Sequence, residues 1–324
     1  MRIIGTGSKL PKRVVTNDDL SNLMDTSDEW IKERTGIATR HVITDEALED
    51  LATIAAQNAL EDAGILPTQL DYIICSNMVN EYVAPSMASI IGGHIGSLCP
   101  AFDLNAACTG FIYALDMAEV LLKSGRAENI LIISAEEPSR IVDWSDRRTC
   151  VLFGDGAAAV VVTKGDELRS IKVSSKSDTS VLYYRRSLEP TPFLNRDEKA
   201  GPLCMNGQEV FKSAVSSSLR DMKYVLNNAG ITKDEVTYFV LHQANMRILD
   251  FIRHHFDAKV EQFPINVNKY GNTSSVSIPL LLDELNRNGK LNQGDLLVFS
   301  AFGAGFTSAA CVLEWNKSVN KKEK

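Results

Sequence analysis

The residue with the clearest capacity for chemistry is Cys108, which lies where an expected strand gives way to an expected helix. Apolar and small residues dominate positions 102–107, and apolar residues then recur at helical spacing from Phe111 to Leu122. A helix start presents unpaired backbone amides and the positive end of the macrodipole, and both stabilise a thiolate. The position therefore predicts a lowered thiol pKa and a nucleophilic sulfur. Many lone cysteines are instead small buried hydrophobes, and this stretch alone does not decide between the two.

Length, charge and cysteine usage limit the possible classes of protein. The chain has 324 residues, a net charge of -7 and 44% hydrophobic residues, as in ordinary soluble proteins. Its acidity argues against nucleic acid as the main partner, because phosphate binding needs clustered Lys and Arg. The six cysteines include no C-x-x-C pair, so no metal site or redox dithiol is indicated. No leader pattern or membrane-length apolar run is present, and we expect a cytoplasmic protein with reduced thiols.

Apolar periodicity outlines strands that alternate with helices, which favours a layered α/β architecture. The runs YIIC, NILIIS and AAAVVVT are continuously apolar, which indicates strands covered on both faces. The helix expected at 28–34 can be capped by Thr26 or Ser27. Another, at 84–95, is expected to be broken by Gly92 and Gly93. The remaining predictions are strands at 2–7, 71–76, 129–134 and 157–163, and helices at 17–24 and 49–64.

The second half of the chain repeats the first. ALEDAGILPTQLDYIICSN and VLNNAGITKDEVTYFVLHQ share a helix end, Ala-Gly-Ile, a polar turn and a Tyr before an apolar strand. The matched segments, at offsets of 166, 166 and 149, are 59–77 with 225–243, 130–134 with 296–300, and 153–162 with 302–312. Three matches in the same order indicate an internal duplication. We expect an N-terminal half at 1–173, a polar connecting region at 174–203 and a C-terminal half at 204–324.

The duplication brings further polar residues into consideration beside Cys108. An offset of 166 carries Cys108 onto Ser274, so two equivalent helix starts can face one pocket. His242 ends the repeated strand YFVLHQAN, at the edge where side chains of a parallel sheet open into a ligand crevice. A histidine at a strand end is often only a structural hydrogen bonder, but a Cys, a His and an Asn at three such ends favour a shared site.

These motifs resemble β-ketoacyl-acyl-carrier-protein synthase III, the thiolase-fold condensing enzyme that begins fatty acid synthesis. The resemblance rests on DLNAACTGFIYAL around Cys108, HQAN from His242, YGNTS from Tyr270, FGDGA from Phe153 and FGAGFT from Phe302. It extends over nearly the whole chain. It implies a homodimer whose subunit is an internally duplicated, five-layered α/β/α/β/α sandwich.

The resemblance also implies the site residues and substrates. Cys108, His242 and Asn272 would form the catalytic triad, with the backbone amides of Cys108 and Ala304 as the oxyanion hole. Acyl-CoA and malonyl-acyl carrier protein would be the substrates, with no cofactor and no metal. Coenzyme A contacts would come from Thr26, Trp30, Arg34, Arg147, Gly207 and Asn245. Carrier-protein contacts would come from Lys212, Gln243, Ala244, Asn245, Met246 and Arg247. The acyl pocket would be lined by Ala84, Phe153, Leu203 and Phe302.

Three departures from the family pattern bear on specificity. Ala84 stands where a Phe is usual before Pro-Ser, which leads us to expect a pocket that accepts primers larger than acetyl. Ser308 and Ala309 replace Trp-Gly. His254 and His255 stand where lysines are common, so we expect carrier docking that is weaker or uses other cations. The alternatives are a specialised synthase that makes a biotin precursor, a quinolone or a polyketide starter, and a noncatalytic acyl- or carrier-binding scaffold.

Overall fold

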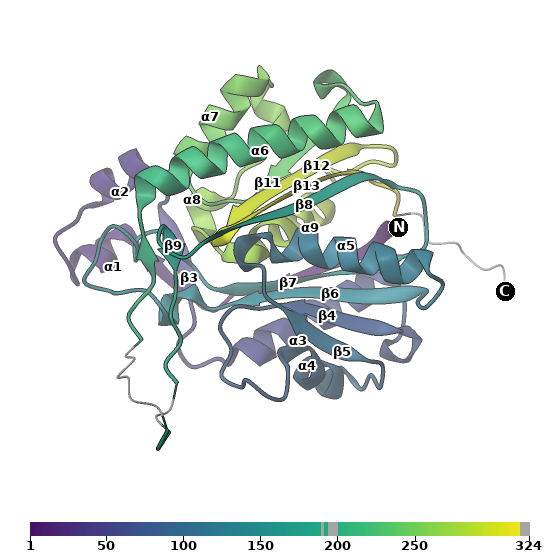
Figure 1. Cartoon of the computed structure of the whole chain (residues 1–324), viewed down its shortest axis with the longest axis horizontal. Coiled ribbons are helices and arrows are strands. Elements are labelled where there is room, and N and C mark those ends of the chain that lie inside the picture. Colours follow the sequence, from purple (N-terminus) through teal and green to yellow (C-terminus); the bar gives the residue numbers. More distant parts are fainter. Residues whose placement is uncertain (189–190, 194–199, 318–324) are drawn as a thin grey trace.

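The structure, a computed structural model, describes residues 1–188, 191–193 and 200–317 and contains two large mixed sheets (Figure 1). The first has the strand order β1-β7-β6-β4-β5. Strand β4 pairs in parallel with β5 and β6, whereas β7 is antiparallel to β6 and β1. The strands are β1 (Arg2–Lys9), β4 (Tyr72–Ser76), β5 (Ala101–Leu104), β6 (Asn129–Glu136) and β7 (Gly156–Thr163).

The second sheet repeats the first and has the order β11-β12-β13-β8. Its strands are β8 (Leu168–Asp178), β11 (Tyr238–Leu241), β12 (Leu296–Gly303) and β13 (Gly305–Glu314). β11 and β12 are parallel as β4 and β6 are, and β13 is antiparallel to both neighbours as β7 is. Gly64 and Gly230, matched by the repeat, both end helices at left-handed φ values of 68° and 67°. The predicted duplication is confirmed.

Helices cover both sheets and fill the space between them, which gives the five layers expected for this fold (Figure 1). The outer faces are covered by α3 (Leu48–Ala63) and α4 (Met87–Ile95), and by α6 (Gly207–Ala229) and α7 (Met246–Phe256). The central layer holds α5 (Gly110–Lys123) and α9 (Ser277–Arg287), whose apolar residues pack against strands of both sheets. Burial on two sides explains why the strands read as continuous apolar runs.

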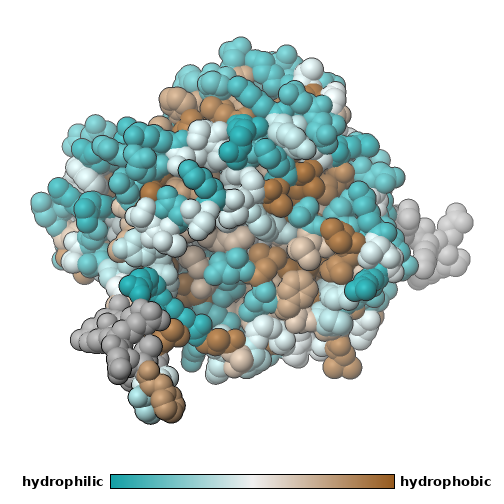
Figure 2. Space-filling model, viewed as in Figure 1, coloured by the Kyte–Doolittle hydropathy of each residue, from teal (hydrophilic) through white to brown (hydrophobic). Residues whose placement is uncertain are grey.

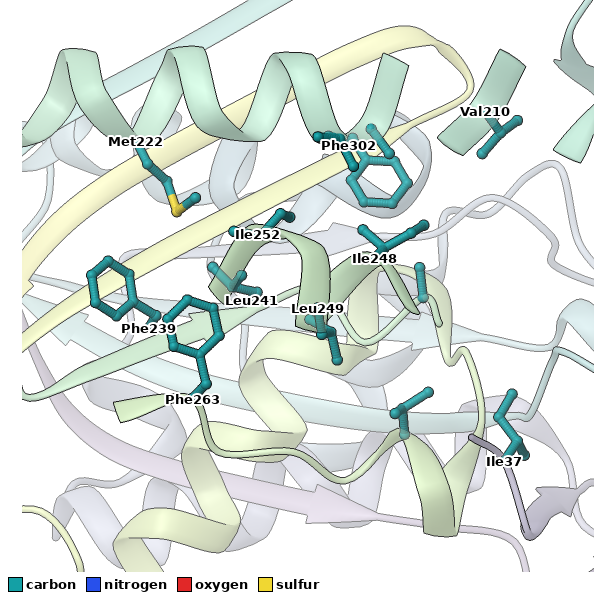
Figure 3. Packing of buried hydrophobic residues seen from close by; sticks show 14 of the residues in the cluster. Ile37, Val210, Met222, Phe239, Leu241, Ile248, Leu249, Ile252, Phe263 and Phe302 are labelled. Atoms are coloured by element: carbon teal, nitrogen blue, oxygen red, sulfur yellow. The ribbon is translucent and has the colours of Figure 1, made fainter. Parts of the chain in front are cut away.

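The outer core under α6 and α7 extends to the edge of the cavity described below (Figure 3). Phe239 of β11 stacks on Phe263, with ring centroids 4.8 Å apart, and both rings are buried. Val210 of α6, Ile248 of α7 and Phe302 of β12 lie toward one end of this core, and all three line that cavity. Packing in this layer therefore supports one wall of the cavity.

Short elements complete the chain. They are β2 (Arg13–Thr16), α1 (Asn17–Ser21), α2 (Asp28–Thr35), β3 (Thr39–Val42), β9 (Leu182–Tyr183), β10 (Cys204–Met205) and α8 (Val267–Tyr270), with 3-10 turns η1 (Pro67–Gln69), η2 (Ala107–Thr109), η3 (Pro138–Arg140), η4 (Lys233–Glu235), η5 (Val260–Gln262) and η6 (Ser274–Val276). β8 spans residue 173, where the N-terminal half was expected to end, and belongs to the second sheet. The division of the chain at residues 173 and 203 stays a prediction.

Several predicted boundaries were wrong. Strand β1 extends to Lys9 instead of residue 7, and α1 ends at Ser21 instead of residue 24. Helix α4 begins at Met87 after Ser86, whose hydroxyl accepts from the Ser89 amide, and it continues through Gly92 and Gly93. Gly92 is accommodated because a Cβ there would meet Ile73 at 3.3 Å, so its missing side chain allows close packing on β4. Strand β6 continues past residue 134 and ends at Glu136. Among the described residues, no helix is both long and apolar enough to cross a membrane.

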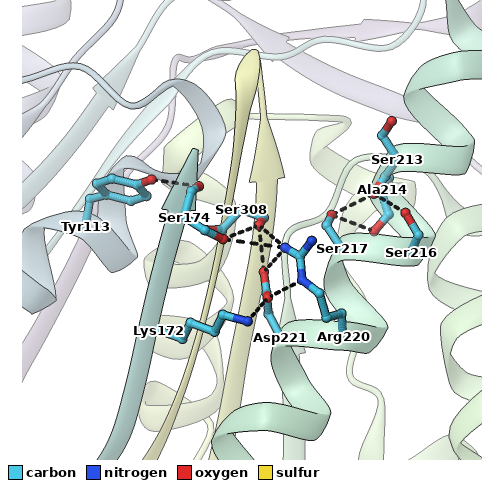
Figure 4. Close-up of polar contacts among 10 residues, drawn as sticks. All are labelled: Tyr113, Lys172, Ser174, Ser213, Ala214, Ser216, Ser217, Arg220, Asp221 and Ser308. Carbon is cyan, nitrogen blue, oxygen red and sulfur yellow. Dashed lines mark hydrogen bonds and ion pairs between the residues drawn. The ribbon is translucent and has the colours of Figure 1, made fainter. Parts of the chain in front are cut away.

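A buried carboxylate joins α6 to the second sheet (Figure 4). Asp221 is fully buried and accepts hydrogen bonds from Ser308 at 2.6 Å and from the Arg220 guanidinium at 2.9 Å. Lys172 of β8 forms an ion pair with it at 2.9 Å. Ser308, the departure from Trp noted in the sequence, is therefore the donor that this carboxylate needs.

Candidate active site

Cys108 lies in η2, between the end of β5 and the start of α5. The preceding Ala107 has a left-handed φ of 48°, and its amide donates to Asn105 Oδ1 at 3.1 Å. Thr109 Oγ1 donates to the Ala106 carbonyl at 2.6 Å, which closes the turn. The chain thus reverses sharply, and the sulfur is held at the start of α5.

His242 and Asn272 come from the second half of the chain. His242 directly follows β11, and its Nδ1 lies 3.1 Å from Ser277 Oγ. Asn272 Oδ1 accepts from the Ser274 amide at 2.9 Å, and its backbone bridges to the Phe153 segment. Because the oxygen of the Asn272 carboxamide is occupied, its NH2 group is the part left to donate into the site.

All three residues line one cavity of about 1060 Å³ between the two halves. Of the residues expected to bind substrates, the cavity brings together Trp30, Arg34, Phe153, Arg147, Leu203, Gly207, Lys212, Ala244, Asn245, Arg247, Phe302 and Ala304. Thr26, Ala84, Gln243 and Met246 do not line it. Three residues from distant parts of the sequence therefore line one cavity, and their direct contact and catalytic roles stay a prediction.

Burial sets the protonation of both reactive groups. Burial raises the pKa of the Cys108 thiol to about 12, an effect that the nearby Glu136 carboxyl reinforces and that a hydrogen bond from Ser274 opposes. This direction is opposite to the lowered pKa expected from the helix start, because the protein around the sulfur outweighs the helix amides even though Cys108 is partly exposed to the cavity. Burial also lowers the pKa of His242 to about 3, so its imidazole is neutral near pH 7.

A carboxyl group that sequence analysis missed lies beneath the sulfur. Glu136, the last residue of β6, is 0% exposed. Ser274 Oγ lies 3.3 Å from Glu136 Oε1 and 3.5 Å from Cys108 Sγ, while Ser275 Oγ donates to the same carboxyl oxygen at 2.8 Å. Burial raises the pKa of Glu136 to about 7. A Glu following an apolar strand gave no signal in the sequence, because only the fold brings it near Cys108.

The hairpin from Phe302 to Thr307 approaches Cys108 closely. A Cβ at Gly303 would lie 2.8 Å from the Cys108 backbone nitrogen, so this approach requires glycine. Thr307 Oγ1 donates to the carbonyls of Ala106 at 3.1 Å and Ala304 at 3.2 Å, which fixes the hairpin against the cysteine turn. The backbone around Ala304 and Cys108 is therefore held together beside the sulfur.

Aromatic and cationic groups also line the cavity. The guanidinium groups of Arg34 and Arg147 lie 5.0 Å and 4.8 Å from the centroid of the Trp30 ring. Ser27, one of the two expected caps, accepts from the Trp30 amide at 3.1 Å and begins α2. An indole and two guanidinium groups together can bind a nucleotide, because the flat groups stack on an aromatic base and the guanidiniums bind phosphate.

The surface expected to meet the carrier protein is only partly available. Lys212 is exposed and Arg247 lies at the start of α7, whereas Gln243 is 1% exposed. The Gln243 side chain accepts from the backbone amides of Asn266 and Val267 and donates to the Leu241 carbonyl. Gln243 therefore holds the backbone behind the site, and we leave it out of the proposed carrier surface.

Apolar residues line the cavity near Cys108, including Phe153, Leu203 and Phe302. Ala84 is exposed on the loop before α4 and lies outside the cavity of its own chain. It can reach an acyl group only in the site of another subunit. Its expected role therefore depends on a homodimer.

Comparisons with known proteins agree with this geometry. Residues 102–179 match the 3-oxoacyl-[acyl-carrier-protein (ACP)] synthase III family, and residues 226–315 match its C-terminal region. A β-ketoacyl-[acyl-carrier-protein] synthase III of Clostridium acetobutylicum is 43% identical, covering 98% of this chain and 99% of that one. The crystal structure of 3-oxoacyl-[acyl-carrier-protein] synthase III from Aquifex aeolicus has a TM-score of 0.91 and 41% identity, covering 97% of this chain and 99% of that chain. The priming β-ketosynthase of the R1128 polyketide pathway has a TM-score of 0.90 and 32% identity, with coverage of 97% and 96%.

The two duplicated halves and their five layers are the thiolase fold of acyl-transferring condensing enzymes. Within that class, the chain belongs to the β-ketoacyl-[acyl-carrier-protein] synthase III family.

Proposed function

We propose that the chain condenses an acyl-CoA primer with malonyl-acyl carrier protein, releasing carbon dioxide and coenzyme A and giving 3-oxoacyl-carrier protein. This reaction would initiate fatty acid biosynthesis. The observation that carries the proposal is the meeting of Cys108, His242 and Asn272 at one cavity between the two halves. The names of the full-length relatives support the same reaction.

In the first half-reaction, the Cys108 sulfur attacks the acyl-CoA thioester. A covalent acyl-cysteine divides one difficult condensation into two easier steps. Trp30, Arg34 and Arg147 would hold the nucleotide end of coenzyme A, since they line the cavity and place two guanidinium groups beside an indole. Gly207 and Asn245, which line the same cavity, would lie along the rest of the coenzyme, with Thr26 beside α2.

In the second half-reaction, loss of carbon dioxide from the malonyl group leaves an enolate. His242 and Asn272 would donate hydrogen bonds to its oxygen, where preorganised donors lower the barrier most. The Asn272 NH2 group is left to donate because its oxygen is occupied. The neutral His242 donates through Nε2 only when Ser277 Oγ donates to Nδ1, 3.1 Å away, in place of its 2.9 Å hydrogen bond to the Ser274 carbonyl.

The enolate carbon would then attack the acyl-cysteine. Backbone amides of Cys108 and Ala304 would bind the oxygen of the tetrahedral intermediate. The close approach of Gly303 to the Cys108 nitrogen supports this pairing of the two segments. Ala244 and Met246 would contact the carrier beside the basic rim that Lys212 and Arg247 supply.

A homodimer would complete the acyl pocket. Strand β5 lies at the free edge of the first sheet, and Figure 2 shows apolar residues on the face that carries α5 and β5. Leu98 before β5, Val120 of α5 and Val83 of the Ala84 loop are 101%, 57% and 68% exposed. Exposed apolar residues of this size favour contact with another chain. Light scattering of the purified protein tests this assembly.

A second candidate is a priming synthase of a specialised pathway. It is favoured by the likeness to the R1128 priming β-ketosynthase, at 32% identity, and by Ala84, which we expect to enlarge the space for a primer in the site of a partner subunit. Both candidates use the same chemistry and differ in the acyl group accepted. The expected absence of a cofactor and the expected cytoplasmic location stay predictions.

Intact-protein mass spectrometry after exposure to a series of acyl-CoAs tests the proposal. We expect one acyl group per chain on Cys108, removed only when malonyl-carrier protein is added, and none on C108S. Absence of acylation by every primer would favour a noncatalytic scaffold. Preference for a single long or branched primer over acetyl would favour the specialised pathway.

A further inference from the structure

Removal of the proton from Cys108 requires a base that the triad does not supply. The thiol remains protonated near pH 7, since burial raises its pKa to about 12. His242 is neutral, but burial lowers its pKa to about 3, which makes it a weak proton acceptor. Its imidazole also has a separate task as a donor to the enolate. The first half-reaction therefore lacks an acceptor for the thiol proton.

Glu136 is a buried carboxyl group close enough to Cys108 to accept the thiol proton through one intervening residue. It lies beneath the cavity, fully enclosed, and its described partners are two hydroxyl groups and the backbone amides of Met78 and Ser275, with no cation among them. A buried carboxyl group without a cation costs stability, and such groups concentrate at functional sites. Cys75 of β4 also faces it, and the pKa of that buried thiol lies well above its ordinary value, chiefly because of burial. Cys75 therefore stays protonated and does not compete for the role.

Ser274 connects the two groups. Its Oγ lies 3.5 Å from Cys108 Sγ and 3.3 Å from Glu136 Oε1. The distance to sulfur is ordinary for a hydrogen bond that involves sulfur, whereas the 3.3 Å distance to the carboxyl oxygen is long, and catalytic hydrogen bonds often tighten only when substrate is bound. The hydroxyl can accept from the thiol while it donates to the carboxylate, which no group that only donates could do.

We propose that Ser274 and Glu136 form a proton relay that deprotonates Cys108 during its acylation. This inference rests on the proposed role of Cys108 and adds two residues to it. Ser274 touches the reacting sulfur and is a catalytic residue. Glu136 does not touch the sulfur. It acts through Ser274, whose hydroxyl it orients and whose proton it accepts, and is therefore a positioning residue.

The relay balances over the half-reaction. The thiol proton moves to Ser274 Oγ while the hydroxyl proton of Ser274 moves to Glu136 Oε1. The electron pair left on sulfur forms the bond to the thioester carbonyl carbon, and the carbon–sulfur bond to coenzyme A then breaks. The proton returns from Glu136 through Ser274 to the departing sulfur, which leaves acyl-Cys108, free coenzyme A thiol and a carboxylate.

Rapid-quench mass spectrometry of Cys108 acetylation by acetyl-CoA, from pH 6 to 8.5, tests the relay. We expect the wild-type rate to rise to a plateau as Glu136 ionises near pH 7, and to fall in heavy water because a proton moves in the transition state. E136Q should be slower by about 10²–10⁴-fold at pH 7.5, and its residual rate should rise with pH without a plateau. E136D, which keeps a carboxyl group, should restore the plateau.

S274A and S275A form a matched pair. Both remove a hydroxyl near Glu136, but only Ser274 lies against the sulfur, so S274A should behave like E136Q and S275A should keep the plateau. S274A should fold, because Ser274 has a left-handed φ of 54° and an alanine of this chain, Ala107, already adopts a φ of 48°. If E136Q does not fold, the comparison of S274A with S275A tests the relay by itself.

Two results would overturn the relay. The first is E136Q acetylating as fast as or faster than the wild type at pH 7.5, because Glu136 would then act only by opposing the thiolate charge. The second is S274A with the wild-type rate and plateau. Neither result touches the proposed function. That function fails instead if no acyl-CoA acylates Cys108 in the wild type while iodoacetamide still alkylates it.

Discussion

Asp221→Asn should destabilise the protein, because the buried Asp221 carboxylate holds together β8, β13 and α6 (Figure 4). The amide keeps the shape of the carboxylate but removes its charge, so Lys172 and Arg220 lose their anion. Hydrogen bonds to charged groups contribute about 1.5–3 kcal/mol each, and breaking a buried pair costs about 3–5 kcal/mol. The Arg220 and Lys172 side chains are 58% and 24% exposed, so water compensates part of the loss. We expect about 2–3 kcal/mol.

For a chain of this length, that loss corresponds to a decrease in Tm of about 3–4 °C. Thermal unfolding followed by circular dichroism measures it, at one protein concentration because assembly raises the apparent stability. Asp257→Asn is the matched control: Asp257 is 96% exposed, pairs with Lys233 at 3.2 Å, and its pair should contribute at most about 1 kcal/mol. A similar loss in both variants would contradict the reasoning.

The loss of stability in Asp221→Asn should also depend on pH. Burial raises the pKa of Asp221, but hydrogen bonds from Arg220, Ser308 and Lys172 outweigh it, so the folded-state pKa lies below the ordinary value. A group with a lowered folded pKa contributes stability above its unfolded pKa, about 3.9, and loses it as pH falls through the folded value. The difference between wild type and Asp221→Asn should therefore be full at pH 7 and shrink below about pH 4. A difference that does not change with pH would indicate lost packing instead of lost charge.

Three predictions concern the site. Asn272→Ala should lower malonyl decarboxylation by about 10²–10³-fold and spare Cys108 acetylation, measured by carbon dioxide release and intact mass. An equal loss of decarboxylation and acetylation would contradict the role of Asn272 as a donor to the enolate. Trp30→Ala should raise KM for acetyl-CoA about tenfold with little change in kcat, since it removes binding made equally in ground and transition states. A fall in kcat with unchanged KM would show that Trp30 acts in the chemical step and not in binding acetyl-CoA. Ala84→Phe should narrow the accepted primers toward acetyl in competition between acyl-CoAs. An unchanged preference would show that this loop does not reach the acyl group.

Sequence reasoning located the duplication because repeated features have simple local causes. Gly64 and Gly230 end their helices in the left-handed region, where glycine is favoured, so both appear in the same Ala-Gly-Ile context. Strands buried on both faces require apolar runs, and the apolar runs of the two halves can be aligned directly in the sequence. The polar residues at the ends of these strands followed from the repeat. The convergence of Cys108, His242 and Asn272 on one cavity was therefore predictable.

Features that depend on packing between distant segments could not be predicted. The raised pKa of Cys108 depends on its burial between the halves, and no local pattern encodes that. Glu136 reads as the polar end of a strand until η6 is placed against it. Gln243 lies within a recognised motif, yet its side chain holds the Asn266 backbone and does not face the surface.

The two short strands β9 and β10 pair with each other in a small sheet of their own, and Leu182, Leu203 and Met205 from this clip line the cavity. The reactive groups, by contrast, are fixed by the large sheets and the central helices. The clip therefore adds to a cavity wall that also includes Phe153 and Phe302. We expect substitutions in the clip to alter the primers that the cavity accepts without moving Cys108, His242 or Asn272, which the clip does not carry.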